Sequence, residues 1–266
     1  IFTAINSKGT IWQNGNLTIN GNYTLQNSTL RINGTGANGN IGINVTSTGN
    51  VLINQTSNIT NGGDSTYRYF FIVNSGSNFS MTDSALSYAG WADVQGQRGL
   101  ELWTTAKNFS GNTLANNYGG VNLYSNNNVI FSNTLNNNSR GIYLLGSSSY
   151  NNISDNIIKF NEGIGIYFNL ANTINNNLIY NNLVDFNALG LFMGESSNNI
   201  IFNNSFSNNT GNAIAIYSGS LEVYAKNNTF SYNIIKDNLG NGFGEPAWNV
   251  YTSNNRFEGN VVINNT

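Results

Sequence analysis

The stretch NNISDNIIKFNEGIGIYF, residues 151–168, has asparagine at 151, 156 and 161, and an isoleucine two residues after each of the first two. The phrase recurs along the chain as N-x-h-x-x-N-x-h-x-x-N, where h is apolar. Its central asparagines are Asn133, Asn156, Asn182, Asn204, Asn233 and Asn260, and a variant copy around Asn112 begins with Lys107. Neighbouring central asparagines are 21 to 29 residues apart. A repeat of this length is typical of a solenoid.

Each repeat carries three short strand signals. The two apolar positions of the phrase give the first two, and a small residue followed by alternating apolar positions gives the third, as in GIYF at 165–168. So small a unit cannot bury its apolar face alone, so we expect successive coils to stack on one shared core. Alternation points Ile153, Ile158, Ile166 and Phe168 inward.

The repeated asparagines have a predicted structural role. Asparagine tolerates the left-handed backbone that a corner between sheets requires. Its carboxamide both donates and accepts hydrogen bonds, so stacked copies can form a ladder of paired amides. We therefore expect equivalent residues to lie in columns, with Ile130, Ile153 and Ile179 directly above one another.

The chain divides by regularity. Residues 107–266 hold the regular asparagine-rich coils, and residues 11–106 read as about four further coils with longer turns, so 11–266 is predicted to be one parallel β-helix. Residues 1–10 contain the short apolar strand IFTAI, which has no partner of its own in the repeat. We interpret 1–10 as an N-terminal strand, a possible donor to another copy, or a linker.

Composition excludes several function classes. Charged residues are 8% of the chain and the net charge is −2, so a nucleic-acid partner is not expected. No apolar run is long enough for direct membrane insertion. Histidine and cysteine are both absent, which removes imidazole and thiolate metal ligands and the usual nucleophile–histidine pairs. We therefore predict no catalytic, cofactor-binding or metal site.

The repeats in NNISDNIIKFNEGIGIYF and in NNIIFNNSFSNNTGNAIAIY (198–217) resemble those of NosD-like and other CASH-type β-helix proteins. The resemblance implies an all-β, right-handed, single-stranded parallel β-helix with three sheets. Such repeats are common in archaeal cell-surface and surface-layer-like proteins. A NosD-like copper role finds only the soft ligands Met81 and Met193, far apart in sequence. A pentapeptide-repeat solenoid is the alternative fold.

Three aromatic residues are candidates for contact with a ligand or a subunit. The middle residue of each third strand should point outward, and these residues include Tyr143, Tyr167 and Phe192. A column of aromatics could bind a sugar ring or a neighbouring copy. It could equally be a stacked ladder that stiffens the sheet.

Two acidic residues, Asp155 and Asp185, are considered as a catalytic pair. Asp185 shares its repeat position with Lys159 and Lys236, which favours an outward salt bridge over a catalytic pair with Asp155.

The chain is also rich in N-x-S/T sequons, and it has fifteen of them. An asparagine inside the ladder cannot carry a glycan, but one outside it can. The glycosylation candidates are Asn16, Asn22, Asn27, Asn33, Asn44, Asn54, Asn58, Asn78, Asn108, Asn152 and Asn227.

These features predict an extracellular or cell-surface structural protein, a glycosylated building block of a coat, filament or adhesive appendage. Its expected partners are other copies of itself or flanking domains of a longer chain, with surface glycans as a further possibility. The alternatives are a polysaccharide lyase or glycoside hydrolase of the β-helix type, and a non-catalytic carbohydrate-binding module.

Overall fold

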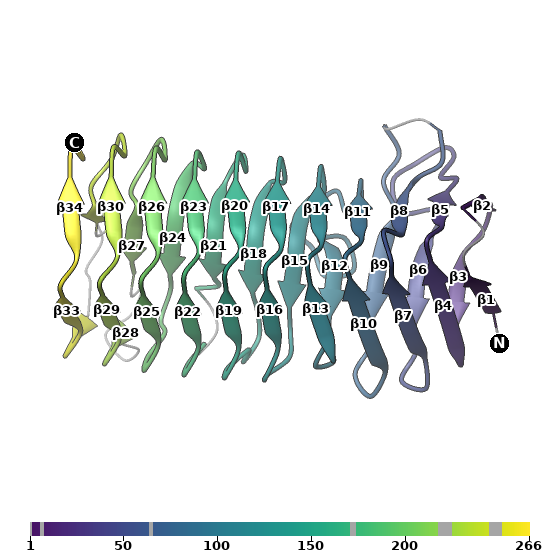
Figure 1. Ribbon diagram of the computed structural model, residues 1–266, viewed down its shortest axis with the longest axis horizontal. Coiled ribbons are helices and arrows are strands. Elements are labelled where there is room, and N and C mark those ends of the chain that lie inside the picture. The colour runs from purple at the N-terminus through teal and green to yellow at the C-terminus, as the bar shows by residue number, and fades with distance from the viewer. Residues whose placement is uncertain (1, 6–7, 64–65, 171–173, 218–224, 245–251) are drawn as a thin grey trace.

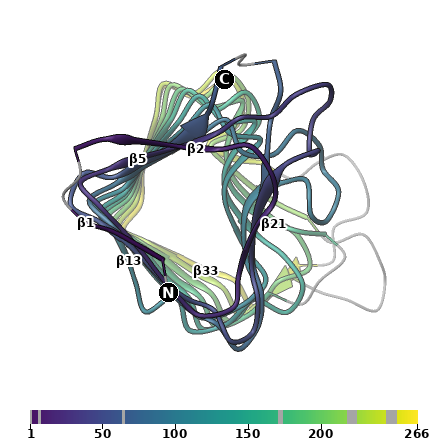
Figure 2. The same cartoon turned by 90° about the vertical axis from the view of Figure 1, so that its right-hand side faces the viewer.

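The computed structural model describes residues 2–5, 8–63, 66–170, 174–217, 225–244 and 252–266, and these form a right-handed parallel β-helix with three sheets. The coils lie side by side along one axis, with the two chain ends at opposite ends of the rod (Figure 1). Viewed along that axis they superimpose as a three-sided outline (Figure 2). The predicted fold class is confirmed, and the pentapeptide-repeat alternative is wrong.

Each coil contributes one strand to each sheet. Sheet A contains β1 (Phe2–Ile5), β4 (Asn22–Gln26), β7 (Asn50–Asn54), β10 (Asn78–Thr82), β13 (Asn108–Ser110), β16 (Val129–Phe131), β19 (Asn152–Ser154), β22 (Leu178–Tyr180), β25 (Ile200–Phe202), β29 (Thr229–Ser231) and β33 (Arg256–Glu258). Sheet B contains β2 (Thr10–Gln13), β5 (Thr29–Ile32), β8 (Asn58–Asn61), β11 (Ala85–Ser87), β14 (Thr113–Ala115), β17 (Thr134–Asn136), β20 (Ile157–Lys159), β23 (Leu183–Asp185), β26 (Ser205–Ser207), β30 (Ile234–Lys236) and β34 (Val261–Ile263).

Sheet C contains β3 (Leu17–Ile19), β6 (Gly42–Val45), β9 (Phe70–Val73), β12 (Gly99–Leu102), β15 (Gly119–Leu123), β18 (Arg140–Leu144), β21 (Ile164–Phe168), β24 (Leu189–Met193), β27 (Ile214–Ile216) and β31 (Phe243–Gly244). A separate pair joins β28 (Ala225–Lys226) to β32 (Thr252–Ser253). Among the described residues no helix is long and apolar enough to cross a membrane.

The core is built from columns of identical repeat positions. Ile130 pairs in register with Ile153, and Ile153 pairs with Ile179, and all three are fully buried. The inward residues Ile158, Ile166 and Phe168 are also fully buried, as predicted. One apolar cluster runs through the coils from Ile19 to Ile235, so the stacked coils share a single core.

The asparagine ladder is present. The Oδ1 atom of Asn156 accepts hydrogen bonds from the backbone N–H and the Nδ2 of Asn133, at 2.9 and 3.1 Å. Its own Nδ2 donates to Oδ1 of Asn182 at 3.0 Å and to the carbonyl of Ile130 at 2.9 Å. The same pattern repeats at the other two asparagine positions of the phrase, so three ladders run through the regular coils.

The left-handed conformation lies one residue earlier than we predicted. The residue immediately before the ladder asparagine has the positive φ, for example Ser132 (57°), Asp155 (56°) and Phe160 (55°). The left-handed position therefore accepts several residue types. What the ladder position requires is a carboxamide, because only its amide and carbonyl together complete the buried hydrogen bonds.

Small residues form a column where the strands of sheet C begin. A Cβ added to Gly141 would lie 2.4 Å from the carbonyl oxygen of Gly165, and one added to Gly165 would lie 2.8 Å from that of Gly190. The backbones of successive coils are thus too close for larger side chains. This explains the small residue at the start of each third-strand signal.

The N-terminal coils use serine where the later coils use asparagine. Ser57 is buried, and its hydroxyl donates to the carbonyls of Leu25 and Asn54. Ser84 is the last such serine, and its N–H donates to Oδ1 of Asn112, where the ladder begins.

The expectation that IFTAI has no partner in the repeat is wrong, because β1 pairs in parallel with β4.

Candidate functional site

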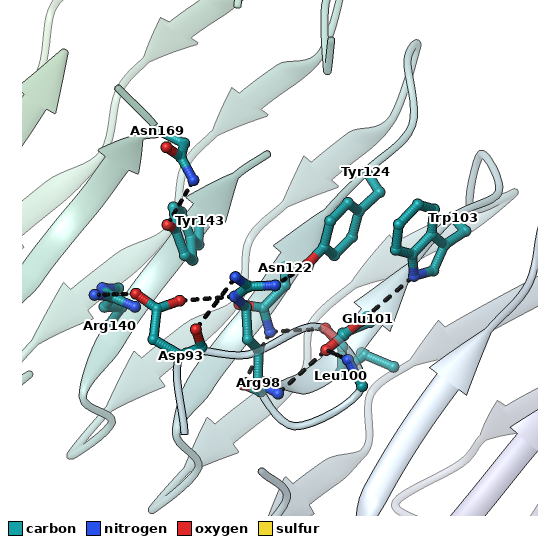
Figure 3. Close-up of polar contacts among 11 residues, drawn as sticks. Asp93, Arg98, Leu100, Glu101, Trp103, Asn122, Tyr124, Arg140, Tyr143 and Asn169 are labelled. Atoms are coloured by element: carbon teal, nitrogen blue, oxygen red, sulfur yellow. Dashed lines mark hydrogen bonds and ion pairs between the residues drawn. The ribbon is translucent and has the colours of Figure 1, made fainter. Parts of the chain in front are cut away.

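One row of side chains points outward from sheet C, as predicted, and forms the candidate site. In register order it runs from Ile72 and Glu101 through Asn122, Tyr143, Tyr167 and Phe192 to Ala215. Part of this outward row is nevertheless covered. Asn122 is 0% and Tyr143 is 3% exposed, because the segment 89–98 between β11 and β12 lies over them (Figure 3).

An ion-pair cluster fastens this segment to the sheet. Oδ1 of Asp93 accepts from Nε of Arg98 at 2.7 Å, and its Oδ2 lies 2.8 Å from Nη2 of Arg140. Arg140 begins β18, two coils beyond the segment. Both carboxylate oxygens are therefore occupied, and one aspartate bridges two arginines from different coils. We call Asp93, Arg98 and Arg140 the arginine clamp.

The clamp controls the charge of Asp93. Partial burial alone would raise the pKa of this carboxyl, but hydrogen bonds and charge from Arg98 and Arg140 outweigh burial and hold the pKa below its ordinary value. Asp93 is therefore ionised at neutral pH. A committed, ionised carboxylate is poorly placed to act as a general acid or base.

The aromatic residues next to the clamp are stacked on one another. The rings of Tyr143 and Tyr167 are parallel, with centroids 4.6 Å apart, and Phe192 meets Tyr167 edge-on at 5.3 Å. The guanidinium of Arg140 lies 4.8 Å from the centroid of Tyr143 and 5.2 Å from that of Tyr167. Burial raises the pKa of both tyrosines, which keeps the phenols neutral. This geometry favours the stiffening-ladder interpretation of the column.

A second group of contacts surrounds Glu101, which is 0% exposed. Its Oε1 accepts from the N–H groups of Gly96 at 2.7 Å and Arg98 at 3.1 Å, and its Oε2 accepts from the indole Nε1 of Trp103 at 3.4 Å. Burial raises the pKa of this carboxyl, although these hydrogen bonds oppose the shift. Glu101 thus holds both the segment and the indole in place.

Trp103 has one ring face covered. Its indole is parallel to the ring of Tyr124, with centroids 3.9 Å apart. The Tyr124 hydroxyl accepts a hydrogen bond from Arg98, which joins this stack to the clamp. Burial, together with the charge of Glu101, raises the pKa of Tyr124 to about 12. The stack and the clamp are therefore one connected unit (Figure 3).

A pocket of about 300 Å³ lies beside this unit. Its lining residues are Ile72, Asn74, Gln95, Gly96, Glu101 and Trp103. Asn74 donates through Nδ2 to Oδ1 of Asn44 and to the carbonyl of Val45, both at 2.7 Å, which leaves its Oδ1 as an acceptor. Gln95 is exposed. The pocket therefore combines an aromatic wall with a rim of uncharged amides.

The two acids that we considered as a catalytic pair belong to different columns: Oδ1 of Asp155 accepts from Asn181 at 3.3 Å, whereas Asp185 lies in the column of Lys159. Lys159 and Asp185 are neighbours in register, as the repeat predicts. Among the described residues, however, no ion pair joins them, and Oδ1 of Asp185 accepts from Ser207 at 2.9 Å and Asn208 at 2.8 Å. The predicted outward salt bridge is therefore wrong. Its lysine lies instead over the ring of Phe160, at 5.6 Å.

The sequon asparagines differ in accessibility. Those exposed to solvent are Asn16, Asn22, Asn78, Asn108 and Asn227. Those half-buried are Asn27, Asn33, Asn44, Asn54, Asn58 and Asn152. In Asn33 the Nδ2 atom, which would carry the glycan, donates to Oδ1 of Asn14 at 2.9 Å. Glycosylation remains a prediction, and the exposed asparagines are the sites where we expect it first.

Sequence reasoning missed the arginine clamp, because the register that brings its residues together is visible only in the structure. The pairing of Gly99 with Gly119, and of Gly119 with Arg140, places Arg140 in the column of Gly99, the neighbour of Arg98, two coils further on. Two spacings of about 4.8 Å separate them, a gap that two arginines and one aspartate can bridge.

Comparison with known proteins supports the fold. A family model described as periplasmic copper-binding protein (NosD) matches residues 16–242. A double mutant of the periplasmic alginate epimerase AlgG superimposes with a TM-score of 0.69 at 15% identity, over 96% of this chain and 71% of that one. The unmutated AlgG gives 0.65 at 16% identity, over 94% and 69%. No protein of curated function matches the sequence. At these identities the structural likeness establishes the fold alone.

The residues present do not fit the copper in the family's description. The chain has no histidine or cysteine. The thioethers of Met81 and Met193 are 0% exposed and lie on different sheets, in β10 and β24. The described residues contain no group of three or more carboxylates that could hold a metal ion. Copper prefers imidazole, thiolate and thioether ligands, and this chain offers none at its surface.

Proposed function

The chain belongs to the NosD family, whose description places its members in the periplasm, and on that premise we propose that it is an exported, non-catalytic structural protein. In this proposal the β-helix is a rigid element of the cell envelope or cell surface. It would work together with other copies or with flanking domains of a longer chain.

One observation carries the proposal: the polar side chains of the repeat are used to hold the coils together. The ladder asparagines of the regular coils, such as Asn133, Asn156 and Asn182, are buried and bonded to their counterparts above and below. A ladder of this kind adds stiffness with each coil and places no reactive group at the surface. Repetition of this type favours a structural element over a single reaction centre.

The enzyme alternative has weaker support. The alginate epimerases are enzymes of the same fold, but fold does not determine function. Here the ionisable groups of sheet C bond to one another. Asp93 is shared by two arginines, and Tyr143 is buried with its hydroxyl accepting from Asn169 at 2.8 Å. General acid–base catalysis needs a group that can exchange a proton with its substrate, whereas Asp93 is held ionised between two arginines and Tyr143 is buried.

Localisation and assembly test the structural proposal. Antibodies against the purified chain, used for immunogold microscopy of intact cells of the source organism, should label the envelope in a continuous pattern. The chain purified from that envelope should appear as rods or ordered arrays in electron micrographs. Exclusively cytoplasmic labelling would overturn the proposal.

Turnover assays separate the enzyme alternative. Incubation of the purified chain with alginate and with polygalacturonate should leave the uronate composition and chain length unchanged. A change that disappears in the Asp93→Asn variant would establish catalysis at the clamp and refute a purely structural role.

A further inference from the structure

The pocket beside Trp103 has features that a structural rod does not require. The indole is parallel to Tyr124 on one face only, and the other side of the ring faces the coil of β9, where Ile72 and Asn74 line the pocket. Gly96 also lines the pocket, and its N–H donates a hydrogen bond to Glu101. We call this the Trp103 pocket.

We propose that the Trp103 pocket binds one neutral sugar ring of a glycan. This goes beyond the structural role, because a rod could fulfil that role with the pocket empty or filled. The pocket volume, about 300 Å³, is at the lower end of the range for small-ligand sites, which suits a single ring.

The wall chemistry selects a sugar over other ligands. A pyranose presents C–H groups on one face and hydroxyls around its rim. An indole face packs against the C–H groups, while the amides of Asn74 and Gln95 can exchange hydrogen bonds with the hydroxyls. Asn74 follows β9 and Gln95 belongs to the segment 89–98, so two separate parts of the chain supply the amides. This is the usual division between an apolar wall and a few orienting polar groups.

The charges around the pocket indicate a neutral ring. Glu101 lines the pocket, and its buried carboxyl group is already bonded to two N–H groups and the indole, so it adds no cation and would repel an anionic ring. Arg98 and Arg140 are paired with Asp93, and neither lines the pocket. A uronate or sulfated sugar would therefore bring its charge into a site with no free cation to receive it, which costs binding energy.

The pocket is already formed without a ligand. Glu101 fixes the indole edge, and Tyr124 and Arg98 fix the ring stack behind it. A preformed wall lowers the entropy lost on binding. The arginine clamp and Glu101 thus act as positioning groups for the Trp103 wall.

Titration with short neutral oligosaccharides tests the inference. The chain labelled with ¹⁵N would be titrated with cellohexaose, mannohexaose and chitohexaose, while the indole N–H signals of its four tryptophans are followed by NMR. The Trp103 signal, assigned with a Trp103→Phe variant, should shift with at least one of the three sugars. An alginate trisaccharide (trialginate), whose rings are uronates, serves as the charged comparison and should bind at least tenfold more weakly than the neutral sugar that binds.

Three variants complete the test. Trp103→Ala should abolish binding, and Gln95→Ala should weaken it several-fold while leaving the fold intact, because Gln95 is exposed. Trp12→Ala is the matched control, because Trp12 is 54% exposed beside Arg31 and far from the pocket. It should bind like the parent chain.

Two results would overturn the inference: no shift of the Trp103 signal with any neutral sugar at millimolar concentration, or unchanged binding in both Trp103→Ala and Gln95→Ala. Tighter binding of trialginate would also refute the neutral-ring assignment. None of these results bears on envelope localisation, so the structural proposal stands or falls separately.

Discussion

Replacing Asn156 with leucine measures what the asparagine ladder contributes to stability. Asn156 is 1% exposed, and its carboxamide makes four hydrogen bonds with Asn133, Asn182 and the carbonyl of Ile130. Leucine has a similar volume, so the change removes the hydrogen bonds and leaves little cavity. In the Asn156→Leu variant, two buried backbone groups lose their hydrogen bond to the carboxamide: the N–H of Asn133 and the carbonyl of Ile130. At about 1–3 kcal/mol for each unsatisfied group, the free energy of unfolding should fall by about 2–6 kcal/mol.

The assay is urea denaturation, followed by circular dichroism, together with amide hydrogen exchange. The matched control is Asn108→Leu, the same substitution at an exposed strand position, which should change stability by less than about 0.5 kcal/mol. Exchange should accelerate most at the Asn133 amide, because that N–H loses its acceptor. Equal stability losses in the two variants, or unchanged protection of the Asn133 amide, would refute the ladder as a source of stability.

Four further predictions concern the glycine column, the carboxyl groups of Glu101 and Asp93, and glycosylation. Gly141→Val should destabilise the fold by at least about 1–3 kcal/mol because its Cβ meets Gly165 and Ile158, whereas Gly21→Val, with open space around it, should be tolerated in the same urea assay. Glu101 has a raised folded pKa, so stability should fall as pH rises through that value, and Glu101→Gln should flatten this part of the pH profile. Asp93 has a lowered folded pKa, so its stabilisation should be present above its ordinary pKa and lost as pH falls through the folded value, a loss that Asp93→Asn should remove. Native material should exceed the bare mass of 28.9 kDa, and Asn108→Gln should remove one glycan in mass spectrometry; a native mass equal to that of the bare chain would refute glycosylation.

The features that repeat could be predicted from the sequence. The same residue type recurs at the same position of several coils, so each position is observed in several copies and its burial can be inferred from all of them. Ile130, Ile153 and Ile179 appear at one phase of the phrase, and stacking then makes their alignment a geometric necessity. The left-handed corner residue was misplaced by one position. The repeated asparagine was taken for the corner residue, but the left-handed residue is the one before it, which is serine, aspartate or phenylalanine in different coils.

The candidate site could be predicted only in part, because its key contacts come from a segment that occurs once. The outward row was found from alternation, but the burial of Tyr143 depends on residues 89–98, which no repeat position describes. Asp93 gives no sign in the sequence that it faces Arg140. Only the register of sheet C brings the two together.

The position of that segment follows from where the ladder stops. The third ladder ends at Asn117, whose Oδ1 accepts from the N–H of Ala89 at 2.9 Å. Ala89 has no carboxamide, so it cannot continue the third ladder into the preceding coil. The corner between β11 and β12 therefore needs no ladder hydrogen bonds to the preceding coil, unlike the later corners between sheets B and C. Residues 89–98 are inserted at this point, and they bring Asp93, Gln95 and Arg98 onto sheet C. A long insertion at one of the later corners between sheets B and C would disturb buried amide pairs of the third ladder, such as that of Asn138 with Asn161. The 29-residue coil from Asn204 to Asn233, in contrast, takes up its extra residues without breaking the ladder. At the corners between sheets B and C, the ladder therefore leaves room for a long segment at the boundary between the serine-based and asparagine-based coils, and the Trp103 pocket lies there.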